Sequence, residues 1–191
     1  MAHIVKKERI VSTAWFDLVA KEIAGQALQE KPYYSLEMSD YVSVLALTAQ
    51  QQVILVRQFR PAVERAVIEL PSGHVEKNES AEASARRELA EETGYVSAVM
   101  EPLGSFWSDT GRMSNRIWYF FADNAMPVKE PGPAEPGVDV VLQDLNQFTA
   151  DVAAGRFESA LNLPAVLLAF LKNRKFRQSL LAITNETNEK K

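Results

Sequence analysis

The chain of 191 residues contains no cysteine, and its only histidines are His3 and His74. Without thiols it can form no disulfide framework, zinc–thiolate site or cysteine nucleophile. Two histidines are also too few for a histidine-rich metal site. We therefore expect neither thiol-based catalysis nor a metal site built from cysteine or several histidines.

Long apolar runs are absent as well. The N-terminal stretch MAHIVKKERI lacks the apolar core of a signal peptide, and the longest apolar runs are too short to span a bilayer. The net charge of -4 gives no electrostatic reason to expect nucleic acid or an anionic membrane as a partner. Apolar and charged contents of 47% and 24% are those of an ordinary soluble protein. Because neither a signal peptide nor a membrane span is predicted, we expect a cytoplasmic location.

What the chain does have is a dense group of charges at residues 87–94, which read RELAEETG. Glu88, Glu91 and Glu92 are spaced i, i+3 and i+4, so on a helix their carboxylates project from one side. Such a cluster destabilises a helix unless a positive charge lies among the carboxylates. A hard divalent cation that prefers oxygen ligands is the natural candidate.

The alternative interpretation is an ordinary solvated helix with ion pairs, such as the i, i+4 pair Glu82–Arg86. Ala81, Ala85 and Leu89 form an apolar stripe that passes between the charges. We therefore expect this stripe to fix the turn that bears the carboxylates against the protein core.

Strand-like runs occur before and after this helix. They cover residues 16–23, 33–38, 41–48, 53–60, 66–73, 96–107, 116–122 and 138–143. Asn78 or Ser80 can cap the start of the acidic helix, and Gly94 is placed to end it. Residues 126–137 form a Pro/Gly-rich long loop, and 145–154 and 163–173 are predicted helices.

This order of elements favours a mixed α+β or sandwich arrangement, because a doubly wound parallel sheet needs a more regular alternation of strand and helix. The length fits one domain with a small accessory lobe. We expect a main domain at residues 41–175 and a polar C-terminal tail at 176–191.

Residues 1–40 are expected to form a small N-terminal β lobe. Short sheets seldom stand alone, so this lobe should pair with the main domain or with a second subunit. Its aromatic residues Trp15, Tyr33 and Tyr34 favour a core or interface role, with stacking on a base as the alternative.

Gly73, then Glu79 after five residues, and then residues 87–95 after seven more form a wider pattern. This pattern resembles the signature of the Nudix hydrolases, with all seven fixed residues at their spacing. Tyr95 stands where the signature prefers an aliphatic residue. The resemblance implies a Nudix-type α/β/α sandwich with a mixed sheet, and a metal-dependent diphosphatase activity.

The sequence at 56–73, VRQFRPAVERAVIELPSG, is similar to the ADP-ribose pyrophosphatase branch of that family, as are the long loop and the helical end. The similarity covers most of residues 40–172. It implies hydrolysis of a nucleoside diphosphate sugar, with ADP-ribose favoured and GDP-mannose or ADP-glucose next. Another nucleotide diphosphatase and a non-catalytic ADP-ribose sensor are the alternatives. The branch also implies a homodimer whose N-terminal lobe helps to build the partner's substrate site.

Glu88 and Glu92 are the first-choice ligands of Mg²⁺, with Mn²⁺ as an alternative ion, and Glu91 is the third ligand. In the resembled family the carbonyl of the residue before the box glycine also binds metal, and this residue is Ser72 here. Arg87 is expected to orient the carboxylates by charge-assisted hydrogen bonds.

A general base is expected outside the helix, because in the resembled branch it is a glutamate of the long loop. Glu135 is at the comparable place, with Glu130 and Asp139 as alternatives; a solvated loop acid is the other interpretation. Arg60 matches an arginine that contacts substrate in the family, and a guanidinium can grip diphosphate oxygens with two hydrogen bonds. A surface salt bridge is its alternative role.

Residues 108–115, SDTGRMSN, depart from the branch, which usually has a Ser-Pro-Gly loop with a glutamate four residues beyond the glycine. Gly111 is matched, but Thr110 replaces the proline and Asn115 replaces the glutamate. We assign substrate contacts to Gly111 and Asn115. The departure weakens ADP-ribose as the specific substrate and leaves the metal chemistry unchanged.

Overall fold

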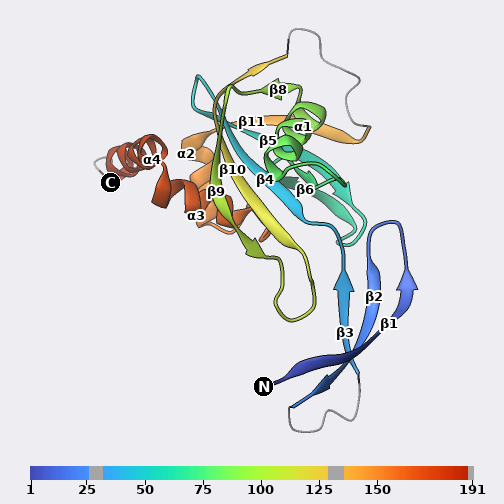
Figure 1. Cartoon of the computed structure of the whole chain (residues 1–191). Coiled ribbons are helices and arrows are strands. Elements are labelled where there is room, and N and C mark those ends of the chain that lie inside the picture. The colour runs from blue at the N-terminus through green and yellow to red at the C-terminus, as the bar shows by residue number, and fades with distance from the viewer. Residues whose placement is uncertain (26–31, 129–135, 189–191) are drawn as a thin grey trace.

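The computed structural model describes residues 1–25, 32–128 and 136–188 (Figure 1). The N-terminal lobe contains β1 (His3–Ser12), β2 (Asp17–Ala24) and β3 (Tyr33–Glu37). The other strands are β4 (Tyr41–Thr48), β5 (Gln52–Arg60), β6 (Arg65–Glu69), β7 (Ser72–His74), β8 (Tyr95–Val96), β9 (Val99–Trp107), β10 (Arg116–Pro127) and β11 (Val138–Asp144). The helices are α1 (Ala81–Thr93), α2 (Leu145–Ala153), α3 (Leu163–Lys172) and α4 (Arg174–Asn188).

The main sheet is mixed. Its strand order is β11-β5-β4-β10-β8, with β6 added to β5, β7 to β4 and β9 to β10. Strands β4 and β10 run parallel, whereas the other pairs are antiparallel. The central strand β4 reads YVSVLALT and is buried over seven of its eight residues, as expected for a strand covered on both faces.

Alternate residues of β4 pack into two separate cores. Val44 and its even-numbered neighbours contact the apolar stripe of α1, including Leu89. Leu45 and Leu47 face the other way, into a cluster with Phe148 and Phe176 from the C-terminal helices. Helix α1 therefore covers one face of the sheet and α2 to α4 the other, which confirms the predicted α/β/α sandwich (Figure 1).

The start and end of α1 follow local capping chemistry. The Ser80 hydroxyl accepts a hydrogen bond from Ala83 N at 3.1 Å, so Ser80 and not Asn78 is the N-cap. Gly94 ends the helix at φ 70°, a conformation that costs little without a Cβ. These caps define the two ends of α1, and Leu89 packs in the core between the helix and the sheet.

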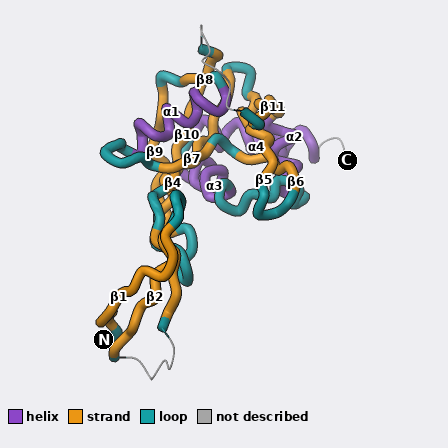
Figure 2. Tube along the Cα trace, turned by 90° about the vertical axis from the view of Figure 1, so that its right-hand side faces the viewer, coloured by secondary structure: helices purple, strands orange, loops and turns teal. Residues whose placement is uncertain are grey.

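The N-terminal sheet extends away from the main domain (Figures 1 and 2). The predicted strands of the lobe are confirmed as β2 and β3, whereas β1 was not predicted because HIVKKERIVS is highly charged. All ten residues of β1 are exposed. The lobe contacts the main domain through β3, where Leu36 N donates to Arg112 O at 2.8 Å and Ser114 N donates to Leu36 O at 3.0 Å.

The segment predicted as a C-terminal tail begins inside helix α4. Phe176 is 1% exposed and its ring packs against Phe121 at 5.7 Å, so the first turn of α4 belongs to the core. Within the described ranges, none of the helices is long and apolar enough to cross a membrane.

Candidate active site

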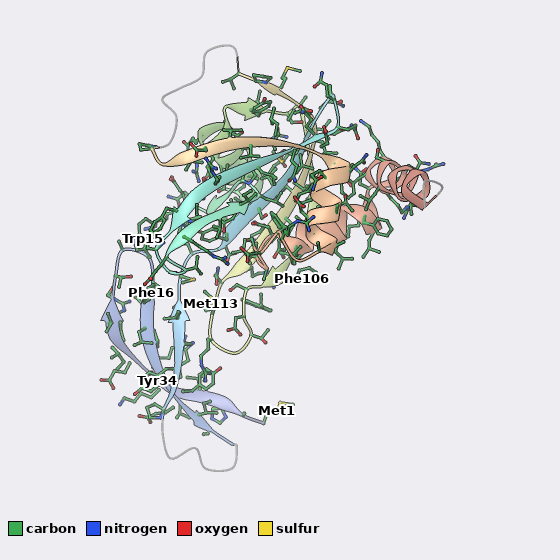
Figure 3. All side chains as sticks on the ribbon, turned by 180° about the vertical axis from the view of Figure 1, so that it is seen from behind. Met1, Trp15, Phe16, Tyr34, Phe106 and Met113 are labelled. Carbon is green, nitrogen blue, oxygen red and sulfur yellow. The ribbon has the colours of Figure 1, made fainter. Side chains whose placement is uncertain are left out.

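An open cavity of about 2110 Å³ lies where α1, the end of β5 and the tip of the N-terminal hairpin approach one another. Its lining includes Glu88 and Glu92 from α1, Arg60 from β5, Trp15 from the turn between β1 and β2, and Asn115. Figure 3 shows Trp15 at the end of the hairpin that lies nearest the main domain. Segments far apart in the sequence thus meet around the acidic helix.

Arg87 is the centre of the charge cluster. Its guanidinium donates to Glu88 Oε1 at 2.8 Å, to Glu91 Oε2 at 3.0 Å and to the His74 carbonyl at 3.1 Å. It also bonds Glu79 at 3.1 Å, and Glu79 Oε2 accepts from Ser84 Oγ at 2.6 Å. This guanidinium therefore ties three carboxylates to the backbone of β7.

The pKa values of this cluster follow from these contacts. Although partial burial opposes it, hydrogen bonding to Glu79, Glu88 and Glu91 raises the pKa of Arg87. Hydrogen bonds from Arg87 and then from Ser84 lower the pKa of Glu79. The lowered pKa favours the ionised form of Glu79 beside the permanent cation of Arg87.

Glu92 is buried and is held by a backbone hydrogen bond. It is 7% exposed, and its Oε2 accepts a hydrogen bond from Ser72 N at 2.9 Å. A carboxylate that is removed from water needs such donors to stay charged. The same bond holds the Ser72 peptide beside Glu92, so the predicted carbonyl ligand and the predicted carboxylate ligand lie in one small region.

Gly73 permits the close approach of β7 to α1. A Cβ built at this position would overlap the Glu88 carboxylate. Any side chain here would have to displace that carboxylate, so the requirement for glycine is steric.

Arg60 is held at the cavity wall by Glu69. Its guanidinium bonds Glu69 Oε2 at 2.7 Å, and the Arg60 side chain is 37% exposed. Gln58 Nε2 donates to the same oxygen at 3.4 Å. The ion pair that was the alternative role for Arg60 is thus present, but it lies on the cavity wall and leaves part of the guanidinium accessible.

Aromatic rings form another wall. The His74 ring lies between Trp15, stacked at a centroid distance of 5.6 Å, and Tyr41, edge-on at 4.3 Å. Trp15 is 68% exposed, so it does not belong to the core of this chain. Burial lowers the pKa of His74, which favours its neutral form.

The Tyr41 phenol, which was not selected from the sequence, also faces this cavity. Burial raises its pKa, and the carboxylates of Glu88, Glu92 and Glu69 raise it further against the opposing charge of Arg60. The hydroxyl therefore stays protonated and is available as a hydrogen-bond donor. No sequence pattern marked it, because Tyr41 reads as the first residue of an apolar strand.

The loop at 108–115 contributes one of its two predicted residues to the cavity. Asn115 lines the cavity but is 3% exposed, and its Oδ1 accepts from Ser108 Oγ at 2.5 Å. Gly111 lies in an exposed turn, where its N–H donates to Asp109 Oδ1 at 2.7 Å, and is not part of the cavity wall. Arg112 stacks on the Tyr33 ring at 4.7 Å, which ties this loop to the N-terminal lobe.

Two of the three predicted general bases, Glu130 and Glu135, lie outside the described residues. The third, Asp139 on β11, forms an ion pair with Arg57 at 2.8 Å. Its neighbours Val138 and Val140 line the cavity. Because side chains alternate along a strand, Asp139 points to the opposite face of the sheet.

The donor set suits a hard cation. Glu88, Glu91 and Glu92 offer carboxylate oxygens and Ser72 offers a carbonyl, which are the ligands that Mg²⁺ prefers. In the part of the chain that the structure describes, no three His, Cys, Asp or Glu side chains form a ready metal cage. This arrangement still fits Mg²⁺, because that ion commonly takes one or two carboxylates and completes its shell with waters and substrate phosphates.

Replacing Arg87 by Met should lower the Tm at neutral pH, because the carboxylates keep their repulsion and lose the guanidinium. Glu79 has a lowered folded pKa, so its contribution to stability is present above its unfolded pKa of about 4.3 and is lost as the pH falls through the folded pKa. The variant loses the largest source of that contribution, the hydrogen bond from Arg87, and keeps the smaller one from Ser84. The difference in Tm between parent and variant should therefore shrink as the pH falls below about 4.3.

Thermal unfolding followed by fluorescence across this pH range checks the prediction. Arg86→Met is the matched control on the same helix, where the arginine bonds the exposed Glu82 at 2.9 Å. It should have a smaller effect at neutral pH. A Tm loss for Arg87→Met that is the same at all pH values would contradict the electrostatic explanation.

Comparison with known proteins agrees with this geometry. The ADP-ribose pyrophosphatase of Bacillus subtilis (strain 168) is 31% identical over 126 residues, which cover 66% of this chain and 68% of that protein. The methanol dehydrogenase activator of Bacillus methanolicus is 34% identical over 112 residues, covering 59% of each chain. A solved structure of an ADP compounds hydrolase superimposes with a TM-score of 0.73 at 18% identity, over 88% of this chain and 91% of that one, which supports the fold alone.

Two further matches extend along the chain. The ADP-sugar pyrophosphatase of Mus musculus is 30% identical over 188 residues, covering 88% of this chain and 85% of that protein. A family model described as the NUDIX domain matches residues 39–161, which include the whole acidic helix and most of the cavity wall. Because these matches span most of the chain, it belongs to the Nudix hydrolase family.

Proposed function

We propose that this protein hydrolyses the diphosphate bond of a nucleoside diphosphate sugar, with ADP-ribose as the favoured substrate and AMP and ribose 5-phosphate as products. The observation that carries the proposal is the cavity itself, which joins the carboxylates of α1 to Arg60 and to the exposed ring of Trp15. A cleft with acids, a guanidinium and an aromatic surface suits a ligand that has a diphosphate and a base.

We infer that Glu88, Glu92, Glu91 and the Ser72 carbonyl would hold Mg²⁺, with Mn²⁺ as an alternative. A bound divalent ion would neutralise charge on the diphosphate and lower the pKa of an attacking water. Nudix hydrolases generally use divalent ions, and the oxygen donor set described above supports this assignment. Arg87 would keep the carboxylates in place, since it already bonds Glu88 and Glu91.

At the cavity wall, Arg60 would bind the diphosphate oxygens. Glu69 holds the guanidinium at 2.7 Å, which reduces the entropy lost when substrate binds. Tyr41 would donate a hydrogen bond from its protonated phenol to the same region. Asn115 and Gly111 are proposed to act in substrate recognition, the latter by shaping the turn.

We propose Glu135 as the general base. It precedes β11, whose residues Val138 and Val140 line the cavity, so the chain next to Glu135 runs along the site. Asp139 is a weaker candidate because it pairs with Arg57 on the opposite face of the sheet. Glu130 stays an alternative from the sequence.

The substrate assignment draws on the relatives. The printed names of the Bacillus subtilis and Mus musculus proteins are ADP-ribose pyrophosphatase and ADP-sugar pyrophosphatase. GDP-mannose and ADP-glucose are the next candidates, because Thr110 and Asn115 change the loop at 108–115. A non-catalytic ADP-ribose sensor is disfavoured, since all three acids of the box are present.

We also propose a cytoplasmic homodimer in which the lobe at residues 1–40 contacts a partner while the domain at 41–175 carries the chemistry. Strand β1 supports this, because it is a sheet edge that is exposed along its whole length. Its exposed apolar residues include Ile4, Val5, Ile10 and Val11. A free edge with apolar side chains is a ready surface for pairing.

A screen of nucleoside diphosphate sugars with Mg²⁺ and Mn²⁺ tests the reaction. We expect release of AMP from ADP-ribose above that from GDP-mannose or ADP-glucose, measured by separation of the nucleotide products. Glu92→Gln should reduce turnover about 100-fold or more, because the loss of even an indirect partner of a metal ligand costs about 10- to 100-fold.

Glu82→Gln is the matched control, since it makes the same change on an exposed part of the same helix. It should keep full activity. If Glu92→Gln matched the parent protein, the metal assignment would be wrong, and tight binding of ADP-ribose without turnover with either ion would favour the sensor.

Glu135→Gln should lower kcat about 100-fold or more with little change in KM, because a general base acts in the chemical step and not in binding. Asp139→Asn should leave kcat nearly unchanged. Steady-state kinetics with ADP-ribose check both variants. Nearly full turnover by Glu135→Gln would remove this residue from the mechanism.

Analytical ultracentrifugation should give twice the 21.3 kDa mass of one chain. Ile10→Glu combined with Val5→Glu should yield monomers, because charges at an apolar sheet edge oppose pairing. Glu22→Gln, a change on the neighbouring strand β2, is the control. A parent protein that sediments as a monomer would contradict the dimer.

A further inference from the structure

Asn162 stands immediately before α3 and is only 1% exposed, although Leu161 and Leu163 on either side are each 36% exposed. It occupies the N-cap position, yet its side chain makes no cap hydrogen bond to the helix. Pro164 reduces the need for such a cap, because proline has no N–H to satisfy. The amide of Asn162 is therefore directed to something other than its own helix.

The oxygen and both N–H groups of that amide are hydrogen-bonded to neighbouring segments. Its Oδ1 accepts from Leu70 N at 3.2 Å, and its Nδ2 donates to Ser43 Oγ and to Ser72 Oγ, each at 2.9 Å. One carbonyl oxygen and two N–H groups are all that an asparagine side chain offers. Ser43 lies on β4, Ser72 begins β7 and Leu70 lies between β6 and β7, so the three partners are 90 to 119 residues away in sequence.

Ser72 connects Asn162 to the acidic helix. Its Oγ donates to Leu70 O at 2.7 Å, and its backbone N–H donates to Glu92 Oε2 at 2.9 Å. Asn162 is thus one residue removed from a buried carboxylate of the site. The segment that carries Asn162 is itself fixed, because Tyr119 Oη donates to Leu161 O at 3.1 Å.

Movement of Ser72 would affect two carboxylates of α1. Gly73 follows it directly and lies so close to α1 that a Cβ would overlap the Glu88 carboxylate. A shift of the Ser72 peptide would therefore disturb Glu92 through its hydrogen bond and Glu88 through steric contact. Both residues are proposed metal ligands.

We propose that Asn162 is a positioning residue for the metal site: it fixes the Ser72 peptide, and through it the carboxylate of Glu92, from the opposite face of the sheet. The inference rests on the proposed function, because it assumes that Ser72 and Glu92 hold a divalent ion. It assigns a role in that site to a residue far from the Nudix signature. Asn162 itself contacts neither the ion nor the substrate.

The test is the affinity of the folded protein for Mn²⁺ without substrate, measured by electron paramagnetic resonance. Asn162→Ala should weaken Mn²⁺ binding about 10- to 100-fold, the range found when an indirect partner of a metal ligand is lost. Turnover at limiting metal should fall by the same factor, and saturating metal should restore much of kcat.

Asn173→Ala is the matched control at the other end of α3. Its Nδ2 donates to Glu101 Oε2 at 2.7 Å and its Oδ1 accepts from Phe176 N at 2.8 Å, away from the cavity. Both variants should lower the Tm, since each leaves polar partners unsatisfied. Only Asn162→Ala should change the affinity for Mn²⁺.

Ser72→Ala keeps the backbone carbonyl and N–H and removes the hydroxyl that bonds Asn162 and Leu70 O, so it should weaken Mn²⁺ binding in the same direction. Where Asn162→Ala does not fold, this variant decides. Unchanged affinity in the folded Asn162→Ala or Ser72→Ala protein, or an equal loss in Asn173→Ala, would overturn the inference. A parent protein that binds no Mn²⁺ would overturn it together with the metal assignment, whereas metal binding without hydrolysis of any nucleoside diphosphate sugar would overturn only the proposed reaction.

Discussion

The charge balance around Arg87 is the constraint on which the rest of the site depends. The three carboxylates that Arg87 bonds, those of Glu79, Glu88 and Glu91, would repel one another, and the guanidinium compensates this repulsion from inside the cluster. Because Arg87 also bonds the His74 carbonyl, the compensation fixes the strand β7 against α1. The hydrogen bonds of Arg87 therefore both balance the charges and fix the shape of the site.

The second determinant is the backbone layer formed by β7, the part of the main sheet that lies against α1. Gly73 allows contact without a side chain, and the Ser72 N–H supplies the hydrogen bond that a buried Glu92 needs. Support for this layer comes from Asn162 on the other side of the sheet. Packing on both faces of the sandwich thus influences the positions of the Ser72 carbonyl and the Glu92 carboxylate.

Other parts of the cavity wall come from the N-terminal lobe and from the loop at 108–115. Trp15 arrives on a hairpin of the N-terminal lobe, and the loop at 108–115 is bonded to Leu36 of that lobe. Arg112 on Tyr33 adds a contact between the same two parts. Trp15 and the loop at 108–115, which both border the cavity, are therefore connected to the N-terminal sheet, which extends away from the main domain.

Sequence alone determined the fold class and the acidic helix, because hydrophobic periodicity, helix caps and the i, i+3, i+4 spacing are local properties. It also identified Arg87, Glu88, Glu91 and Glu92 as one group, since neighbours on a helix are neighbours in the chain. It missed β1, which is highly charged and exposed along its whole length. Tertiary structure alone decided that Asp139 faces away from the cavity, that Glu69 holds Arg60, and that Asn162 reaches Ser72. These contacts depend on how distant strands pair and on which face each side chain occupies, and no local pattern carries that information.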